Sequence, residues 1–127
     1  MFRHKITLKE IPVNRDDYDD FTYSDVGGDR CFEIIGDGKA TLGHVFVTEN
    51  TETPNGVPCK TYIDWLELLS LYRGKRLLRQ VMKSLSNKFG VLYFESVPGA
   101  NFKYRKIGAE SLGMDEITER EIFRYKA

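Results

Sequence analysis

Apolar residues recur along the chain with two different periods, one typical of strands and one typical of a helix. The strand-like segments are short and rich in branched and aromatic residues. They cover residues 6–11, 31–35, 39–48, 61–70 and 91–96. After Gly74 the apolar positions change to helical spacing, with charged residues on the other side. The apolar face of this predicted helix consists of Leu77, Leu78, Val81, Met82 and Leu85.

Glycine and proline mark the boundaries of these segments. Asp37-Gly38 suits a hairpin turn that needs positive φ, so it should join two antiparallel strands. Residues 49–60 contain two prolines and an Asn-Gly step, which predicts a loop. Gly90 is placed to end the long helix.

The last third of the chain predicts a short helix and two short strands. The helix covers 100–107 and stops at Gly108, and the strands lie near 110–114 and 119–125. Strand, helix, strand and helix therefore follow one another from residue 61, which predicts a parallel strand pair with a right-handed crossover. The predicted fold class is α/β with a mixed α+β sheet, built on a β-α-β-α core with a C-terminal β-hairpin. With 127 residues, one domain over 1–127 is expected.

Charge and cysteine content narrow the function classes. Nineteen basic and nineteen acidic residues balance, so no global field attracts nucleic acid. Cys31 and Cys59 are far apart, and neither histidine lies at metal-ligand spacing, so no metal is expected. The first ten residues lack the apolar run of a signal peptide, and no stretch approaches the ~20 apolar residues that span a bilayer. We expect a soluble cytoplasmic protein that binds neither membrane nor nucleic acid.

One segment suggests chemistry: a strand ending near Ser70 runs into the basic turn Arg73-Gly74-Lys75-Arg76, and a helix follows. The first amides of a helix have no partners within it and lie at the positive end of the helix dipole. Such a turn attracts anions, and flanking basic side chains strengthen it. Taken alone, a short basic turn is more often a solvated surface feature.

The segment resembles motif A of the GNAT superfamily of N-acetyltransferases, an aliphatic strand followed by Y-R-G-K-G-x-G. The residues that match it in place or in kind are Leu68, Tyr72, Arg73, Gly74 and Lys75. Downstream, residues 104–109 (YRKIGA) are similar to the family's Y-x-K-x-G-F helix end. The resemblance covers roughly residues 31–126.

The resemblance implies a splayed sheet whose fourth and fifth strands diverge to admit acetyl-coenzyme A, with an amine of a small molecule or protein as acceptor. Tyr104 would be the general acid that protonates the leaving thiolate. Asp64, four residues before Leu68, would be the general base, and Glu67, expected on the opposite strand face, is the alternative. Backbone groups of Leu68 and Leu69 would hold the pantetheine arm. The full set of implied coenzyme-binding residues is Leu68, Leu69, Arg73, Gly74, Lys75, Arg76, Leu77 and Leu78.

Two glycines of the family's motif are replaced, by Arg76 and Leu78. A residue in the first helical turn has negative φ, so we expect arginine to fit there without strain. Three functions remain open. The altered glycines favour a degenerate member that binds or inhibits without catalysis, whereas Tyr104 and Asp64 favour an active enzyme. A nucleic-acid-binding stripe along the helix is the third, and the neutral net charge argues against it.

Overall fold

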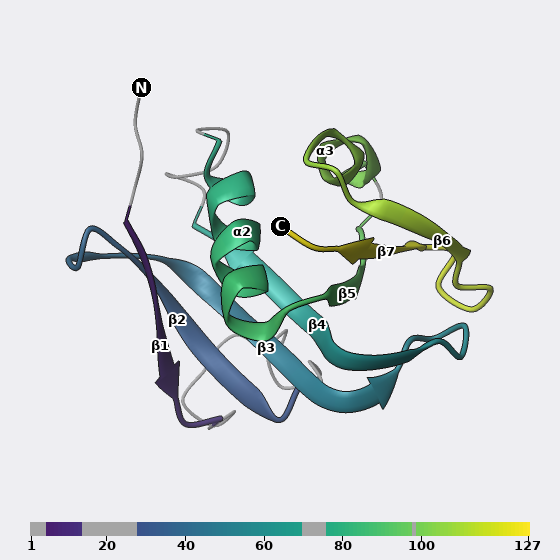
Figure 1. The fold of residues 1–127 in the computed structure, drawn as a ribbon, viewed down its shortest axis with the longest axis horizontal. Helices are drawn as coiled ribbons and strands as arrows, with labels where there is room; N and C mark the ends of the chain where they lie inside the picture. The colour runs from purple at the N-terminus through teal and green to yellow at the C-terminus, as the bar shows by residue number, and fades with distance from the viewer. Residues whose placement is uncertain (1–4, 14–27, 70–75, 98) are drawn as a thin grey trace.

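The computed structural model describes residues 5–13, 28–69, 76–97 and 99–127, which form a mixed seven-stranded sheet and two helices. The strand order in the sheet is β1-β2-β3-β4-β5-β7-β6 (Figure 1). In chain order the elements are β1 (Ile6–Ile11), β2 (Arg30–Gly36), β3 (Ala40–Glu52), β4 (Pro58–Leu68), α2 (Leu77–Phe89), β5 (Leu92–Glu95), α3 (Asn101–Lys106), β6 (Glu110–Met114) and β7 (Glu121–Tyr125). The predicted fold class, with its β-α-β-α core and C-terminal hairpin, is confirmed.

The predicted loop over 49–60 is too long. Strands β3 and β4 continue to pair out to Glu52 and Pro58, which leaves only residues 53–57 in the turn. Proline is tolerated here because the first residue of a strand need not donate to the ladder. Thr53 closes the turn, since its backbone N–H donates to the carbonyl of Val57 at 2.8 Å.

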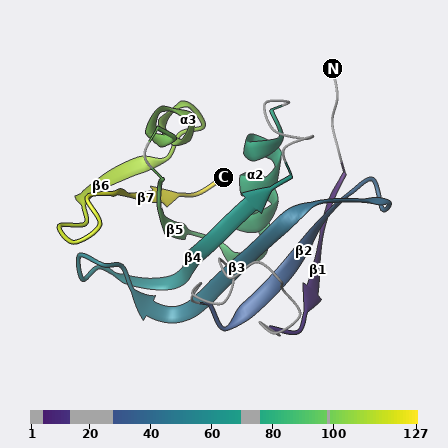
Figure 2. The ribbon, with the colours of Figure 1, turned by 180° about the vertical axis from the view of Figure 1, so that it is seen from behind.

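Helix α2 covers one face of the sheet and packs its apolar side against the core residues of the strands. It lies in front of the sheet in Figure 1 and behind it in Figure 2. Four residues of its predicted apolar stripe are buried and Leu78 is partly buried, and each fully buried side chain contributes about 1.5–3 kcal/mol. The residues of this cluster that are nearly inaccessible to solvent include Leu77, Val81, Met82 and Leu85 of α2 and Phe32, Val45, Val47, Ile63 and Phe94 of the sheet. Gly90, with φ 83°, ends the helix as predicted.

The opposite face of the sheet carries a smaller cluster formed by Cys31 and Phe46, with Trp65 packed against them. Both cysteines are free and buried. Across the described ranges, neither helix combines the length and the apolar character needed to cross a bilayer.

Candidate active site

The neighbouring parallel strands β4 and β5 pair over only two positions. Tyr62 lies beside Tyr93 and Ile63 beside Phe94, and no further pairing follows. Beyond this point β4 continues along β3 as far as Leu68. Strand β5 instead stays with β7, and the N–H of Ser96 donates to the carbonyl of Glu121 at 2.9 Å. The two strands therefore separate after Ile63. Figure 1 shows β4 and β5 running in different directions.

A β-bulge at Asp64 marks the start of this separation. Phe46 of β3 pairs with Trp65 and the next residue, Val47, pairs with Ile63, so Asp64 is an extra residue on β4. The hydroxyl of Thr48 donates to Asp64 Oδ2 at 2.7 Å and fixes the carboxylate. Bulges of this kind re-aim side chains.

The bulge corrects the expectation that Asp64 and Glu67 occupy opposite faces of β4. Val45 and Val47 belong to the core under α2, so the intervening and flanking residues of β3 point to the other face. Glu67 pairs with His44, and Asp64 accepts the hydrogen bond from Thr48, both on that other face. The extra residue shifts the alternation by one position, which brings the two carboxylates to the same side of the sheet.

Helix α2 begins beside the separated strands. Of the predicted turn, Arg73, Gly74 and Lys75 lie outside the described residues, whereas Leu77 is buried and Leu78 is partly buried. Among the described residues no side chain caps the first amides of α2, and its first turn holds no acidic residue. The positive end of the helix dipole is thus not neutralised by the described part of the chain.

The expectation that Arg76 has negative φ is wrong. Arg76 is the residue before the helix, not part of its first turn, and it adopts φ 58° and ψ 17°. Residues at the cap have non-helical angles, and this one takes the left-handed conformation that glycine adopts without strain. For an arginine the cost is of order 1 kcal/mol.

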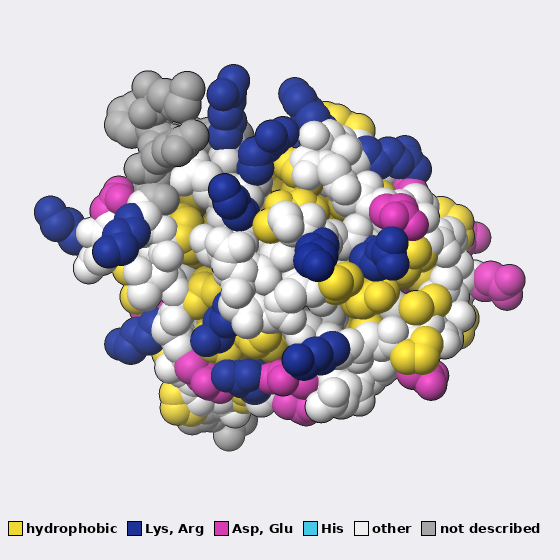
Figure 3. Space-filling model, in the orientation of Figure 1, with side chains coloured by type: hydrophobic (Ala, Val, Ile, Leu, Met, Phe, Trp, Pro, Cys, Tyr) yellow, Lys and Arg dark blue, Asp and Glu magenta, His cyan; other side chains and the backbone are white. Residues whose placement is uncertain are grey.

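Basic side chains gather where the start of α2 meets the end of α3. Arg79 Nη2 donates to the carbonyl of Lys106 at 3.3 Å, which joins the two helices. Figure 3 shows Lys and Arg side chains over the upper part of the molecule, where α2 and α3 lie. The exposed basic residues of the two helices on this side are Arg79, Lys83, Lys103, Arg105 and Lys106, whereas Lys88 lies at the other end of α2 beside Phe89.

Tyr104 of α3 lies close to the point where the strands separate. Its ring centroid is 4.6 Å from that of Phe94, the last residue of β5 that pairs with β4. Burial raises the pKa of its phenol, so the hydroxyl stays protonated at neutral pH. The hydroxyl of Ser96 donates to Asn101 Oδ1 and so ties the start of α3 to the end of β5.

The two leucines predicted to hold the pantetheine arm differ in their backbone directions. The N–H of Leu69 donates to the carbonyl of Leu42 at 2.8 Å, toward the β3 side. Because backbone groups alternate along a strand, those of Leu68 point toward the edge that β5 has left.

Sequence reasoning missed a pair of carboxyl groups at the end of β5. The hydroxyl of Thr118 lies 3.3 Å from Glu95 Oε2 and 3.0 Å from Asp115 Oδ2. Burial and a hydrogen bond with Asp115 raise the pKa of Glu95 to about 7, while the bond with Glu95 lowers the pKa of Asp115. No local motif could have revealed the pair, because the residues are distant in sequence and meet only through β6 and β7.

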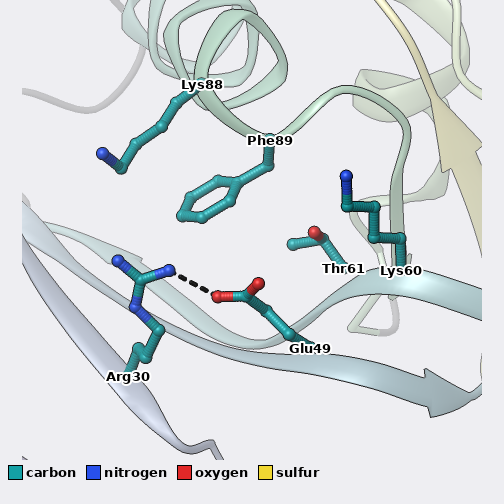
Figure 4. Close-up of a pocket in the computed structure, with 6 residues that line it drawn as sticks. All are labelled: Arg30, Glu49, Lys60, Thr61, Lys88 and Phe89. Atoms are coloured by element: carbon teal, nitrogen blue, oxygen red, sulfur yellow. Dashed lines mark hydrogen bonds and ion pairs between the residues drawn. The ribbon is translucent and has the colours of Figure 1, made fainter.

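A cavity of about 220 Å³ lies at the other end of α2 and contains none of the predicted site residues (Figure 4). Its lining includes Arg30, which binds the carboxylates of Glu10 and Glu49, and the ring of Phe89. Within the described ranges no grouping of histidine, cysteine or acidic side chains has the geometry of a metal site.

The comparisons with known proteins point to one fold. No protein-family model matches the chain, and no curated sequence is similar to it. The chain is similar in structure to the acetyltransferase from Agrobacterium tumefaciens str. C58, with a TM-score of 0.60 and 13% identity. The match covers 99% of this chain and 94% of that one. At this identity the likeness shows a shared fold, which is that of an acetyltransferase.

Proposed function

We propose that this chain is an acetyl-coenzyme-A-dependent N-acetyltransferase. The observation that carries the proposal is the separation of β4 and β5 after Ile63, with a basic helix start on one side and Tyr104 on the other. An acetyltransferase fold over nearly the whole chain supports it.

The coenzyme would bind on the face that carries α2 and α3. Its pyrophosphate would accept hydrogen bonds from the first amides of α2, at Leu77 and Leu78, with the guanidinium of Arg76 beside it. The pantetheine arm would follow the edge of β4 at Leu68, where β5 no longer pairs. Leu69 was also predicted to bind the arm, but its N–H donates to Leu42 on the β3 side. Arg73, Gly74 and Lys75 of the predicted binding set lie outside the described residues.

The acceptor amine would approach from the opposite face, where acidic side chains lie. The amine nitrogen attacks the thioester carbonyl carbon, the C–S bond breaks, and the thiolate takes a proton from the Tyr104 hydroxyl. An ammonium must first lose a proton to a carboxylate or to water. Asp64 and Glu67, now on one face, are the two bases that the sequence suggests.

A binding or inhibitory module without catalysis is the second candidate. The left-handed conformation of Arg76 favours it, because an arginine there can crowd a phosphate that a glycine would let approach.

The test is acetyl transfer to the amines of spermidine and of a lysine-containing peptide with a free N-terminus, followed by mass spectrometry and by release of the coenzyme thiol. The enzyme proposal expects acetylated amine and free thiol in equal amounts. Coenzyme binding with no product from either acceptor favours the module, and absence of both binding and product contradicts both candidates.

A further inference from the structure

Glu95 occupies a distinctive place in the sheet. It is the last residue of β5 and directly follows Phe94, the last residue of β5 that pairs with β4. Since Phe94 points into the core under α2, alternation places Glu95 on the opposite face. That is the face of Asp64. Burial and, to a lesser extent, the charges of Glu95 and Asp64 raise the pKa of Tyr62, so both carboxylates lie near its phenol.

The partner of Glu95 is a rigidly held carboxylate. Asp115 is 7% exposed, its Oδ1 accepts the N–H of Ile117 at 3.0 Å, and its own N–H donates to the carbonyl of Arg120 at 2.8 Å. The Ile117 N–H and the Thr118 hydroxyl both donate to the Asp115 carboxylate and so stabilise it as an anion. In the carboxyl pair, the proton therefore belongs to Glu95.

Among the described groups near Glu95, some raise its pKa and others lower it. Burial and the hydrogen bond and charge of Asp115 favour the neutral acid, while Thr118 and the charge of Arg120 favour the carboxylate. The resulting pKa of about 7 lies where a general base works best, because the carboxylate is populated and still binds a proton.

We propose that Glu95 is the general base of the acetyl transfer and that Asp115 is its positioning residue. This rests on the proposed N-acetyltransferase function. Asp64 lies across the gap on β4, where the Thr48 hydroxyl of β3 donates to its Oδ2. The acceptor class that follows is a primary alkylamine, which is protonated at neutral pH and needs such a base.

The proton balance is complete without a further reactant. Glu95 takes one proton from the ammonium, and the neutral nitrogen then attacks the thioester carbon. As the C–S bond breaks, the thiolate takes the proton of Tyr104, and the second N–H proton returns to the Tyr104 phenolate directly or through water. The products are the amide, the thiol and one proton that Glu95 releases to solvent.

Glu95→Gln tests the base, because the amide can donate to Asp115 as the protonated acid does and so keeps the pair together. Thiol release from acetyl-coenzyme A is measured from pH 5.5 to 9.5, with water alone and with spermidine as acceptors. We expect kcat/KM to fall by ~10²-fold or more near neutral pH. The difference in kcat/KM between Glu95→Gln and the parent should shrink toward high pH, because solvent deprotonates the amine there. A purely structural defect would lower kcat/KM at high pH as well. Glu116→Gln is the matched control, because it removes an exposed carboxylate directly after Asp115. This variant should have the same kcat/KM as the parent.

Asp115→Asn tests the positioning role through a pH profile. Removing the negative neighbour should move the acid limb of kcat/KM from near pH 7 to lower pH. Calorimetry with acetyl-coenzyme A on the parent and all variants separates a failure of the Glu95 assignment from a failure of the proposed function. If Glu95→Gln binds acetyl-coenzyme A as tightly as the parent and has the same rate and pH profile, the assignment of Glu95 is overturned and the proposed function is not. Absence of coenzyme binding or thiol release in the parent overturns the proposed function and this inference together.

Discussion

Arg76 is the residue at which stability and ligand binding should respond in opposite directions. Arg76→Gly relieves a left-handed arginine and should raise the free energy of unfolding by about 1 kcal/mol. It also removes a cation from the start of α2 and should weaken acetyl-coenzyme A roughly tenfold, in line with a charge-assisted bond. Urea denaturation and calorimetric titration measure the two effects separately.

Arg76→Ala is the matched control, because alanine keeps the strain and loses the charge. Its affinity should fall as in the glycine variant, its stability should stay near that of the parent, and both affinity losses should shrink as salt is raised. Tighter binding by Arg76→Gly than by the parent would show that the arginine obstructs the site, which favours the non-catalytic module.

Tyr104 should matter to turnover and not to affinity. Tyr104→Phe keeps the ring packed against Phe94 and removes only the hydroxyl, so turnover should fall by ~10²-fold while coenzyme affinity stays nearly unchanged. Tyr93→Phe, a partly buried tyrosine on the other face of β5, serves as control. Equal turnover in Tyr104→Phe and the parent excludes Tyr104 as the acid.

Residue-level prediction succeeded where the fold needs little adjustment and failed where a local irregularity intervenes. The short helix that carries Tyr104 was predicted and is present, while the role of Tyr104 as acid stays a prediction. The face of Glu67 relative to Asp64 did not, because one bulged residue reverses the alternation on which the prediction relied. The positive φ of Arg76 was not predicted. The helix starts one residue later than expected, at Leu77, so Arg76 is the residue before the helix and not part of its first turn.

At the scale of elements, an ion pair holds α3 to β7 and so positions Tyr104. Arg105 Nη2 contacts both oxygens of Glu121, one of them at 2.6 Å, and the Glu121 side chain is only 5% exposed. Hydrogen bonds from Ser111 and Arg105 lower the pKa of Glu121. Arg105→Ala should reduce the free energy of unfolding by about 1–3 kcal/mol at pH 7.

The loss of stability in Arg105→Ala should depend on pH if it comes from the Arg105–Glu121 ion pair, and not if it comes from lost packing contacts. A lowered pKa stabilises the fold above the unfolded-state pKa of about 4.5, and the contribution disappears as pH falls through the folded-state pKa. The parent and Arg105→Ala should therefore converge in acid. Arg124→Ala breaks an exposed pair with Glu110 and should cost under about 1 kcal/mol. Equal losses in the two variants would contradict the role given to Glu121.

Element boundaries could be predicted where a glycine or a change of period fixes them. The end of α2 at Gly90 is an example. The ends of β3 and β4 could not be predicted, because cross-strand pairing carries both strands through residues that favour loops in isolation.

For the whole molecule, the carboxyl pair should shape the dependence of stability on pH. The pKa of Glu95 is raised to about 7, so its stabilising contribution is present below about pH 4.5 and is lost as pH rises through 7. Glu95→Gln has no such transition. The parent should thus lose stability relative to this variant between about pH 5 and 8, as measured by urea denaturation at each pH. Parallel curves over that range would contradict the raised pKa.

The overall topology followed from the order of the segments, since a strand, a helix and a strand predict a parallel pair with few alternatives. The proposed acidic face was harder to predict, because Glu95 and Asp115 meet through pairings that span the C-terminal third of the chain. Local motifs predict the proposed coenzyme side, and only the assembled sheet brings the acidic residues of the other face together.

The central claim is that acetyl-coenzyme A binds where β4 and β5 separate, at the start of α2. Isothermal titration with acetyl-coenzyme A, supported by a thermal shift, tests it without knowledge of the acceptor. The account predicts saturable binding that weakens with salt and in Arg76→Ala, with a stabilisation of about 2.7 kcal/mol at 100 times the dissociation constant. No heat of binding and no thermal shift at millimolar acetyl-coenzyme A would contradict it.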